Sequence, residues 1–156
     1  MTIEENRALC EKYPFLTVKV DDCDNPIEPD YEFTWLDSMP DGWRKAFGLQ
    51  MCEELKAALI EDNMLEDYKI VQVKEKYGGL RWYDNGHSEK VADVIEKYEE
   101  LSERTCIDCG EPAKYMSLGW ICPYCTSCAE LSFIRRLQNS DHYDDIRFKD
   151  YFREIK

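Results

Sequence analysis

Five of the chain's eight cysteines lie between Thr105 and Leu131, and this cluster limits what the chain can fold into more than any other feature. Cys106 and Cys109 form a Cys-x2-Cys pair, and Gly110 after them permits a tight backbone turn. A second close pair follows near Cys125. Four thiolates complete the tetrahedral coordination of Zn²⁺, and two close pairs at this separation are typical of structural zinc sites.

The second pair is either Cys122 with Cys125 or Cys125 with Cys128. Pro123 favours the start of a helix, which would place Cys125 and Cys128 on one face of its first turn, where the helix dipole stabilises thiolates. A knuckle, a hairpin and a ligand-bearing helix in this order predict a treble-clef-like subdomain. We predict one Zn²⁺ bound by Cys106, Cys109, Cys125 and Cys128, with Cys122 as an unbound neighbour.

The amino-terminal part of the chain shows helical patterns on either side of a loop. Thr2 and Glu5 form a capping-box pattern, which predicts a helix from Ile3 to Lys12. The segment PFLTVKV (14–20) predicts a strand, and the prolines within residues 21–30 predict a loop. A long helix is predicted from Ser38 or Asp41 to about Asn63, because apolar residues recur at i, i+4 spacing: Trp43, Phe47, Met51, Leu55 and Leu59.

The most distinctive local pattern is a β-hairpin over residues 69–84. Two β-rich runs flank Gly78-Gly79, which can supply the positive φ angles of a two-residue turn. Ser88 then predicts the cap of a helix whose apolar face carries Val91, Val94, Ile95, Tyr98 and Leu101. Another helix is predicted from about Cys125 through Leu131, Ile134 and Leu137, and the tail over residues 142–156 is predicted to pack back as a helix.

Together these elements predict an α+β fold, in which an antiparallel hairpin-containing sheet packs on amphipathic helices and a treble-clef-like zinc subdomain is added. A chain of 156 residues is expected to form one domain with a small appended unit. The expected division is a core over residues 1–104, a four-Cys zinc subdomain over 105–138 and a helical tail over 139–156. Within the core we expect an acidic loop (21–41), a helix (42–62), the hairpin (69–84) and a second helix (88–104).

The formal net charge of −13 bears on the class of partner. Ordinary nucleic-acid binding is disfavoured, because phosphate contacts require Lys and Arg clustered on one face. Eight acids and no Lys or Arg occur from Asp21 to Asp41, so this segment is expected to project a negative potential that suits a basic protein surface. A solvated loop that only aids solubility is the alternative. The residues predicted to contact the partner are Asp21, Asp22, Asp24, Glu28, Asp30 and Glu32.

One enzymatic alternative uses the same cysteines. Zinc nucleobase deaminases carry H-x-E and P-C-x-x-C at helix starts, where His and two Cys bind zinc and the Glu transfers protons. His87 and Glu89 could act in this way with Cys125 and Cys128, but Pro123 does not directly precede Cys125 and the first Cys pair would have no role. A closed four-Cys site leaves no open position for an activated water, so we predict a zinc without a catalytic function.

A further alternative is a zinc-ribbon adaptor that binds protein or nucleic acid through Arg135 and Arg136.

The start of the sequence, MTIEENRALC, has early acids and no apolar run, so we expect no signal peptide. No apolar run approaches the ~18 residues of a membrane span. We therefore expect a cytoplasmic protein, in which closely spaced cysteines bind metal more often than they form disulfides.

Three stretches between Asp41 and Ala129 carry a resemblance to a known family: DGWRKAFGLQMCEEL, VKEKYGGLRWY, and ERTCIDCGEPA with GWICPYCTSC. They resemble an uncharacterised family of small four-Cys zinc-binding proteins from phages and prophages of Gram-positive gut bacteria. The resemblance implies a virus-associated setting in the host cytoplasm and a structural zinc site, and it supplies no catalytic residue. We therefore predict a stoichiometric, anti-CRISPR-like inhibitor of a host nucleic-acid-handling or defence protein, acting partly as a nucleic-acid mimic.

Overall fold

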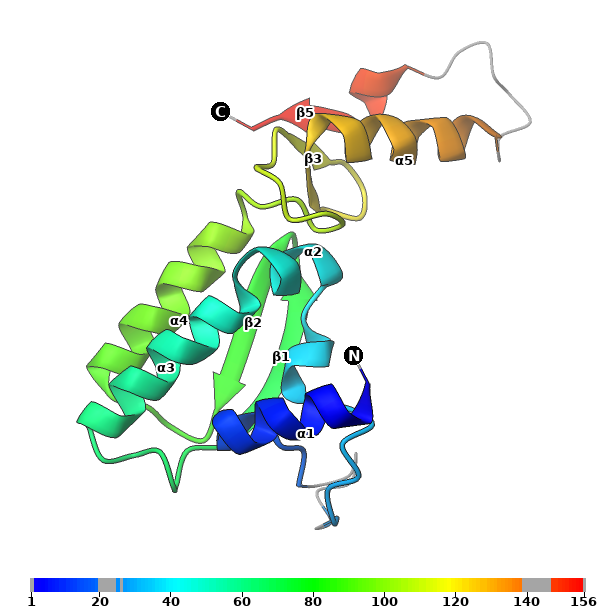
Figure 1. Cartoon of the computed structure of the whole chain (residues 1–156). Coiled ribbons are helices and arrows are strands. Elements are labelled where there is room, and N and C mark those ends of the chain that lie inside the picture. The colour runs from blue at the N-terminus through cyan, green and yellow to red at the C-terminus, as the bar shows by residue number, and fades with distance from the viewer. Residues whose placement is uncertain (1, 20–24, 26, 139–146, 156) are drawn as a thin grey trace.

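The computed structural model describes residues 2–19, 25, 27–138 and 147–155, and it has a mixed α/β architecture (Figure 1). A larger part contains the helices α1 (Ile3–Lys12), α3 (Leu49–Glu61) and α4 (Glu89–Ser102) and the hairpin of β1 (Ile70–Lys76) and β2 (Gly79–Asp84). A smaller cysteine-rich part follows α4. The two sheets are both antiparallel, one with the order β1-β2 and the other with the order β4-β3-β5. None of the helices in the described ranges is long and apolar enough to cross a membrane.

Helix α1 (Ile3–Lys12) confirms the helix predicted from the capping box. The Thr2 amide donates to Glu5 Oε2 at 2.7 Å, and the Glu5 amide donates to Thr2 Oγ1 at 3.2 Å. The strand predicted over residues 14–20 is wrong for the described residues 14–19, because Pro14–Leu16 form a 3₁₀ turn and Thr17 makes an isolated bridge to Thr34. Phe15 and Leu16 are both buried, a pattern that the alternating faces of a strand do not allow on a one-sided sheet.

The long predicted helix is confirmed over residues 41–61, although it is not α-helical throughout. It consists of α2 (Asp41–Trp43), a π-helical turn (Arg44–Gly48) and α3 (Leu49–Glu61), and it ends before Asn63, which has a φ of +56°. A short 3₁₀ helix, Trp35–Ser38, precedes this long helix. The five apolar residues that predicted this helix, Trp43, Phe47, Met51, Leu55 and Leu59, are all buried.

The hairpin is confirmed, with a turn one residue earlier than predicted. Strands β1 (Ile70–Lys76) and β2 (Gly79–Asp84) pair in antiparallel register, and Lys76 faces Gly79. The two turn residues are therefore Tyr77 and Gly78, with φ angles of +55° and +82°. The prediction of Gly78-Gly79 as the turn was wrong, because Gly79 is already the first residue of β2.

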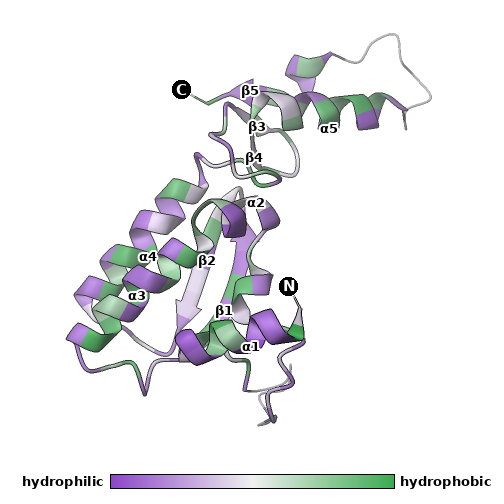
Figure 2. Ribbon diagram, in the orientation of Figure 1, coloured by the Kyte–Doolittle hydropathy of each residue, from purple (hydrophilic) through white to green (hydrophobic). Residues whose placement is uncertain are grey.

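Helix α4 (Glu89–Ser102) begins as predicted, with the Ser88 hydroxyl accepting from the Val91 amide. Helices α3 and α4 lie side by side next to the hairpin (Figure 1), and hydrophobic and hydrophilic residues alternate along both helices (Figure 2). The predicted apolar face is correct for Val91, Ile95 and Tyr98, but Leu101 is exposed. The buried stripe continues one residue later at Ser102, whose Oγ accepts from the Leu80 amide at 2.7 Å.

The cysteine-rich part consists of β3 (Tyr115–Ser117), β4 (Pro123–Tyr124), α5 (Thr126–Gln138) and β5 (Phe152–Glu154). The helix predicted near Cys125 is confirmed, but Leu131 and Ile134 on it are exposed rather than in a core. The prediction of a helical tail is wrong for the described residues 147–155. These residues form a 3₁₀ turn, Phe148–Asp150, and the strand β5, because the open edge of β3 offers backbone partners to an incoming strand.

Candidate metal centre

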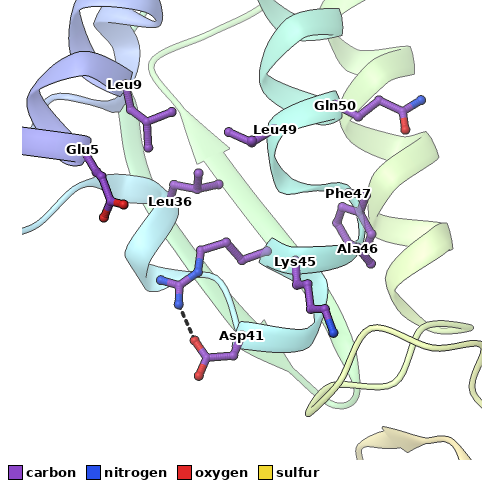
Figure 3. Close-up of a pocket in the computed structure, with 10 residues that line it drawn as sticks. Glu5, Leu9, Leu36, Asp41, Lys45, Ala46, Phe47, Leu49 and Gln50 are labelled. Atoms are coloured by element: carbon purple, nitrogen blue, oxygen red, sulfur yellow. Dashed lines mark hydrogen bonds and ion pairs between the residues drawn. The ribbon is translucent and has the colours of Figure 1, made fainter. Parts of the chain in front are cut away.

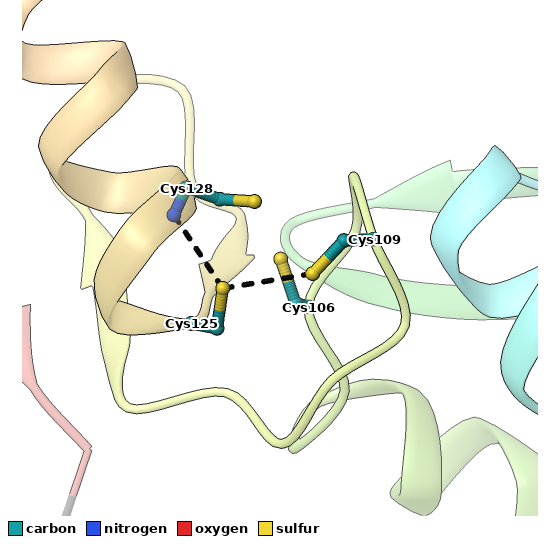
Figure 4. Close-up of side chains that lie close together, drawn as sticks. All are labelled: Cys106, Cys109, Cys125 and Cys128. Atoms are coloured by element: carbon teal, nitrogen blue, oxygen red, sulfur yellow. Dashed lines mark hydrogen bonds between the residues drawn. The ribbon is translucent and has the colours of Figure 1, made fainter.

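The structure brings together the four cysteines that were predicted as ligands (Figure 4). The Sγ atoms of Cys106, Cys109, Cys125 and Cys128 all lie within 4.8 Å of one another, and the Sγ atoms of Cys109 and Cys125 are 3.6 Å apart. Four sulfurs at about 2.3 Å from one tetrahedral Zn²⁺ are separated by about 3.8 Å. The geometry therefore allows one metal ion to contact all four sulfurs.

The first pair is held by a tight knuckle. The Gly110 amide donates to the Cys106 carbonyl at 3.0 Å, and the Cys106 amide donates to the Glu111 carbonyl at 2.8 Å. Gly110 has a φ of +85°, in the left-handed region that glycine adopts without a steric penalty. This turn directs the side chains of Cys106 and Cys109 toward the cluster, as the spacing and Gly110 predicted.

The second pair is positioned by the start of α5. Cys125 directly precedes the helix, and its carbonyl accepts from the Ala129 amide at 3.0 Å. Cys128 lies in the first turn, and its amide donates to Cys125 Sγ at 3.4 Å. An N–H group and a helix N-terminus directed at sulfur both stabilise the thiolate form that a metal requires.

The electrostatics of the cluster favour a bound cation. Burial, together with hydrogen bonds to the neighbouring cysteines, raises the pKa of the Cys128 thiol far above its ordinary value. Four thiolates this close together are compatible only if a positive charge compensates them, and metal binding then releases the thiol protons. A tetrahedral set of four soft sulfur donors suits zinc or iron and does not suit calcium or magnesium.

The remaining cysteines are not part of this donor set. Cys122 is buried, and burial followed by the charges of Glu75 and Asp108 raises the pKa of its thiol to about 11. Cys122 is not among the four cysteines whose Sγ atoms converge, and its role as an unbound neighbour stays a prediction. Cys10 and Cys52 are buried in the larger part, and Cys23 lies outside the described residues.

The knuckle also joins the cluster to the larger part of the molecule. The Gly42 amide donates to the Ile107 carbonyl at 2.9 Å, and the Trp43 indole donates to the Thr105 carbonyl at 2.9 Å. A Cβ atom on Gly42 would lie 2.3 Å from the Cys106 carbonyl oxygen, and one on Gly110 would lie 2.6 Å from the Gly42 carbonyl oxygen. Sequence reasoning missed this contact, although a glycine inside a helical pattern can have a packing reason.

The structure does not bring the residues of the deaminase alternative together. His87 and Glu89 lie at the start of α4, whereas the cysteines follow its end (Figure 1). A helix of fourteen residues separates the two ends by about 20 Å. His87 Nδ1 instead contacts Asp84 Oδ1 at 2.8 Å in the turn that follows β2.

The acidic segment is described in part. Asp21, Asp22 and Asp24 lie outside the described residues, and Glu28, Asp30 and Glu32 are exposed. Asp37 and Asp41 are used within the fold, because both accept from the Arg44 guanidinium, at 3.0 and 2.5 Å.

On α5, Arg135 and Arg136 are both exposed, and the Arg136 guanidinium lies 5.3 Å from the centroid of the Tyr151 ring.

A hollow of about 460 Å³ opens between α1 and the π-helical turn (Figure 3). Its lining combines Leu9, Leu36 and Leu49 with the charged side chains of Glu5 and Arg44. Arg44 pairs with Asp37 and Asp41, and Glu5 belongs to the capping box of α1. Since these two charged groups already have partners within the fold, we assign no ligand to this hollow.

Comparison of this chain with protein-family models, with curated proteins and with solved structures finds no match. The resemblance to phage-associated proteins therefore stays a prediction.

Proposed function

We propose that this protein is a zinc-stabilised binding protein that acts by stoichiometric contact with a partner and not by chemistry at the metal. The observation that supports this proposal is the cluster of four sulfurs within 4.8 Å of one another. Four thiolate ligands fill the coordination sphere of Zn²⁺, so no position is left for a water or a substrate. The order of knuckle, β3–β4 hairpin and ligand-bearing α5 supports a treble-clef-like arrangement around the ion.

In this proposal the zinc ion links two segments on either side of the β3–β4 hairpin. Cys106 and Cys109 come from the knuckle, and Cys125 and Cys128 come from the entry to α5, with the β3–β4 hairpin between them. Structural zinc sites supply folding free energy directly, with apparent binding energies of about 10–16 kcal/mol in small zinc-finger peptides at pH 7. The ion would hold α5 against the knuckle and, through Gly42, against the larger part.

The metal assignment is tested by elemental analysis of the purified protein. We expect one zinc per chain, reduced or lost in Cys106→Ser and Cys128→Ser. The matched control is Cys122→Ser, which removes a buried cysteine of the same segment outside the donor set and should keep the zinc. Zinc retained by Cys128→Ser and lost by Cys122→Ser would contradict the ligand set, and iron in place of zinc would contradict the choice of metal.

The proposed partner is a protein with a basic surface. More specifically, we propose a host nucleic-acid-handling or defence protein that the chain inhibits by nucleic-acid mimicry. The net charge of −13 and the exposure of Glu28, Asp30 and Glu32 support this class of partner. Complementary charge increases the association rate and makes it dependent on salt.

The acidic segment is tested with the triple variant Glu28→Gln, Asp30→Asn, Glu32→Gln. Binding to a panel of basic nucleic-acid-binding proteins from a bacterial host should be slower to form and less sensitive to salt than for the wild type. The control neutralises three exposed acids of α4 instead, Asp93, Glu96 and Glu100, and so changes the net charge equally. Equal effects of the two variants would show that the segment acts only through the total charge.

A further inference from the structure

Two aromatic side chains stand out from the surface where the β1–β2 turn meets the β3–β4 loop. Tyr77 and Trp120 are each 75% exposed, more than the other described large hydrophobic residues. They flank a cleft of about 220 Å³ that is also lined by Glu75, Lys76, Gly119 and Ile121. Exposed Trp and Tyr are enriched at the centres of protein interfaces, because each buries a large area at a low entropy cost.

Tyr77 is presented by a fixed turn. It occupies the first position of the β1–β2 turn with a φ of +55°, and the following Gly78 amide donates to Glu75 Oε1 at 2.7 Å. A Cβ atom on Gly78 would lie 3.2 Å from the Ile121 carbonyl oxygen and from Met116 Sδ. The tip of the hairpin therefore rests against the β3–β4 loop, and the cleft lies where the two tips meet.

Trp120 is presented by a loop that is fixed from inside. The buried Ser117 hydroxyl donates to the Trp120 carbonyl at 2.5 Å and accepts from the Cys122 amide at 2.9 Å. The Leu118 amide donates to the Tyr151 carbonyl at 2.7 Å, which ties the same loop to the segment before β5. A rigid loop that exposes an indole is organised for binding, since little conformational freedom is lost when a partner covers the ring.

The chemistry of the cleft indicates a cationic guest. Two aromatic faces attract a cation through their quadrupoles, and the Glu75 carboxylate adds a negative charge to the lining. The Nζ atom of Lys76 already lies 5.7 Å from the centroid of the Tyr77 ring. Because the Lys76 side chain is exposed and flexible, a cation of the partner can displace it from the ring. Arginine is the cation of proteins best suited to such a site, because its planar guanidinium stacks on aromatic rings and forms paired hydrogen bonds with a carboxylate.

A nucleic acid is the less favoured guest. Bases also stack on exposed aromatic rings, but single-strand binding requires a positively charged groove along the backbone. The chain has 33 acids against 20 Lys and Arg residues, so phosphates would be repelled.

We propose that Tyr77 and Trp120 form an aromatic clamp that receives an arginine side chain of a basic protein partner. The proposal rests on the proposed function, in which the protein binds such a partner, and it assigns the contact to a defined place. Tyr77 belongs to the larger part and Trp120 to the cysteine-rich part. The clamp therefore exists only while the metal centre holds the two parts together.

The test is titration of the zinc-loaded full chain with a hexa-arginine peptide. Binding is followed by calorimetry and by the NMR signal of the Trp120 indole N–H, which is identified by its absence in Trp120→Ala. We expect this signal to shift, and we expect Tyr77→Asn and Trp120→Ala each to weaken binding about two- to fivefold, the size of an exposed cation–π contact. Asn suits the positive φ at position 77, so that variant removes the ring without straining the turn.

The matched control is Tyr83→Ala, which removes a 42% exposed ring from β2 of the same hairpin, outside the cleft lining. It should bind hexa-arginine as the wild type does, and Trp120→Phe should keep most of the affinity. Wild-type affinity in both Tyr77→Asn and Trp120→Ala would overturn the clamp. If the Glu28, Asp30 and Glu32 variant weakened binding in that case, the proposed function would stand without the clamp. Binding of oligothymidylate that is lost in the same two ring variants would also overturn the arginine assignment.

Discussion

The two parts of this molecule are stabilised in different ways. In the larger part, residues from α1, the long helix, the hairpin and α4 form one continuous buried cluster that includes Trp43, Leu55, Leu80 and Tyr98. In the cysteine-rich part the strands have two or three residues each, and the described buried side chains are few: Thr105, Cys106, Ser117, Cys122, Pro123, Ala129 and Phe152. A small unit that cannot bury enough apolar surface depends on disulfides or a metal, so we infer that burial stabilises one part and coordination the other.

Removal of the metal is expected to have the largest effect on stability of the changes that test this difference. A strong chelator, or Cys109→Ser, should unfold the cysteine-rich part and leave the larger part folded. The loss should amount to several kcal/mol of local stability, since structural zinc is bound with an apparent energy of about 10 kcal/mol or more. Hydrogen exchange should show amides of 106–138 losing protection while those of α3 and β1 keep theirs. Cooperative loss of both parts would show that they are a single folding unit.

Leu55→Ala should produce the opposite pattern. Leu55 is fully buried in α3, and truncation of such a side chain costs about 2–5 kcal/mol. We expect the urea midpoint of the larger part to fall while the zinc content of the folded protein is unchanged. A lower zinc affinity in this variant would mean that the stability of the core and the affinity of the metal centre are coupled.

Gly110→Ala tests the joint between the two parts. The substitution places a side chain at a φ of +85° and 2.6 Å from the Gly42 carbonyl oxygen, which should cost about 1–3 kcal/mol and weaken zinc binding. Gly119→Ala is the control, because Gly119 has a similar φ of +88° but nothing within 4 Å of its added Cβ. The difference between the two in zinc competition assays isolates the contact with Gly42 from the backbone strain. Equal losses would assign the whole effect to strain.

The smallest expected effect is that of Ser88→Ala. Ser88 caps α4 by accepting from the Val91 amide, and loss of such a cap costs about 1 kcal/mol. The change lies at the end of α4 away from the cysteines, so thermal unfolding should shift by a few degrees with no change in zinc affinity. Ser88→Thr, which keeps a capping hydroxyl, should restore the stability.

Local patterns predicted the elements whose cause is local. The capping box of Thr2 and the apolar spacing from Trp43 to Leu59 act within a few helical turns, and both helices are present. The cysteine quartet was predicted because ligand spacing and Gly110 encode the knuckle directly. Each of these signals lies within the segment that it forms.

The wrong predictions concern elements whose cause is not local. Strand β5 forms because β3 offers it an edge, and nothing in residues 147–155 alone requires that pairing. The π-helical turn follows α2, where the Gly42 amide donates to the Ile107 carbonyl, 65 residues further along the chain. The strand predicted at residues 14–20 relied on β propensity, which the burial of both Phe15 and Leu16 outweighed. Contacts between distant segments decide these elements.

The contact between Gly42 and Gly110 has a mechanical consequence. The backbone of α2 lies directly against the backbone of the knuckle there, and the Gly42 amide donates a hydrogen bond to the Ile107 carbonyl. Tilting the cysteine-rich part would have to break that hydrogen bond or compress one backbone against the other. The backbone contact thus fixes the orientation of α5 relative to the larger part. A force applied to the carboxyl end of α5 would be transmitted through this contact to the helix that begins at Asp41.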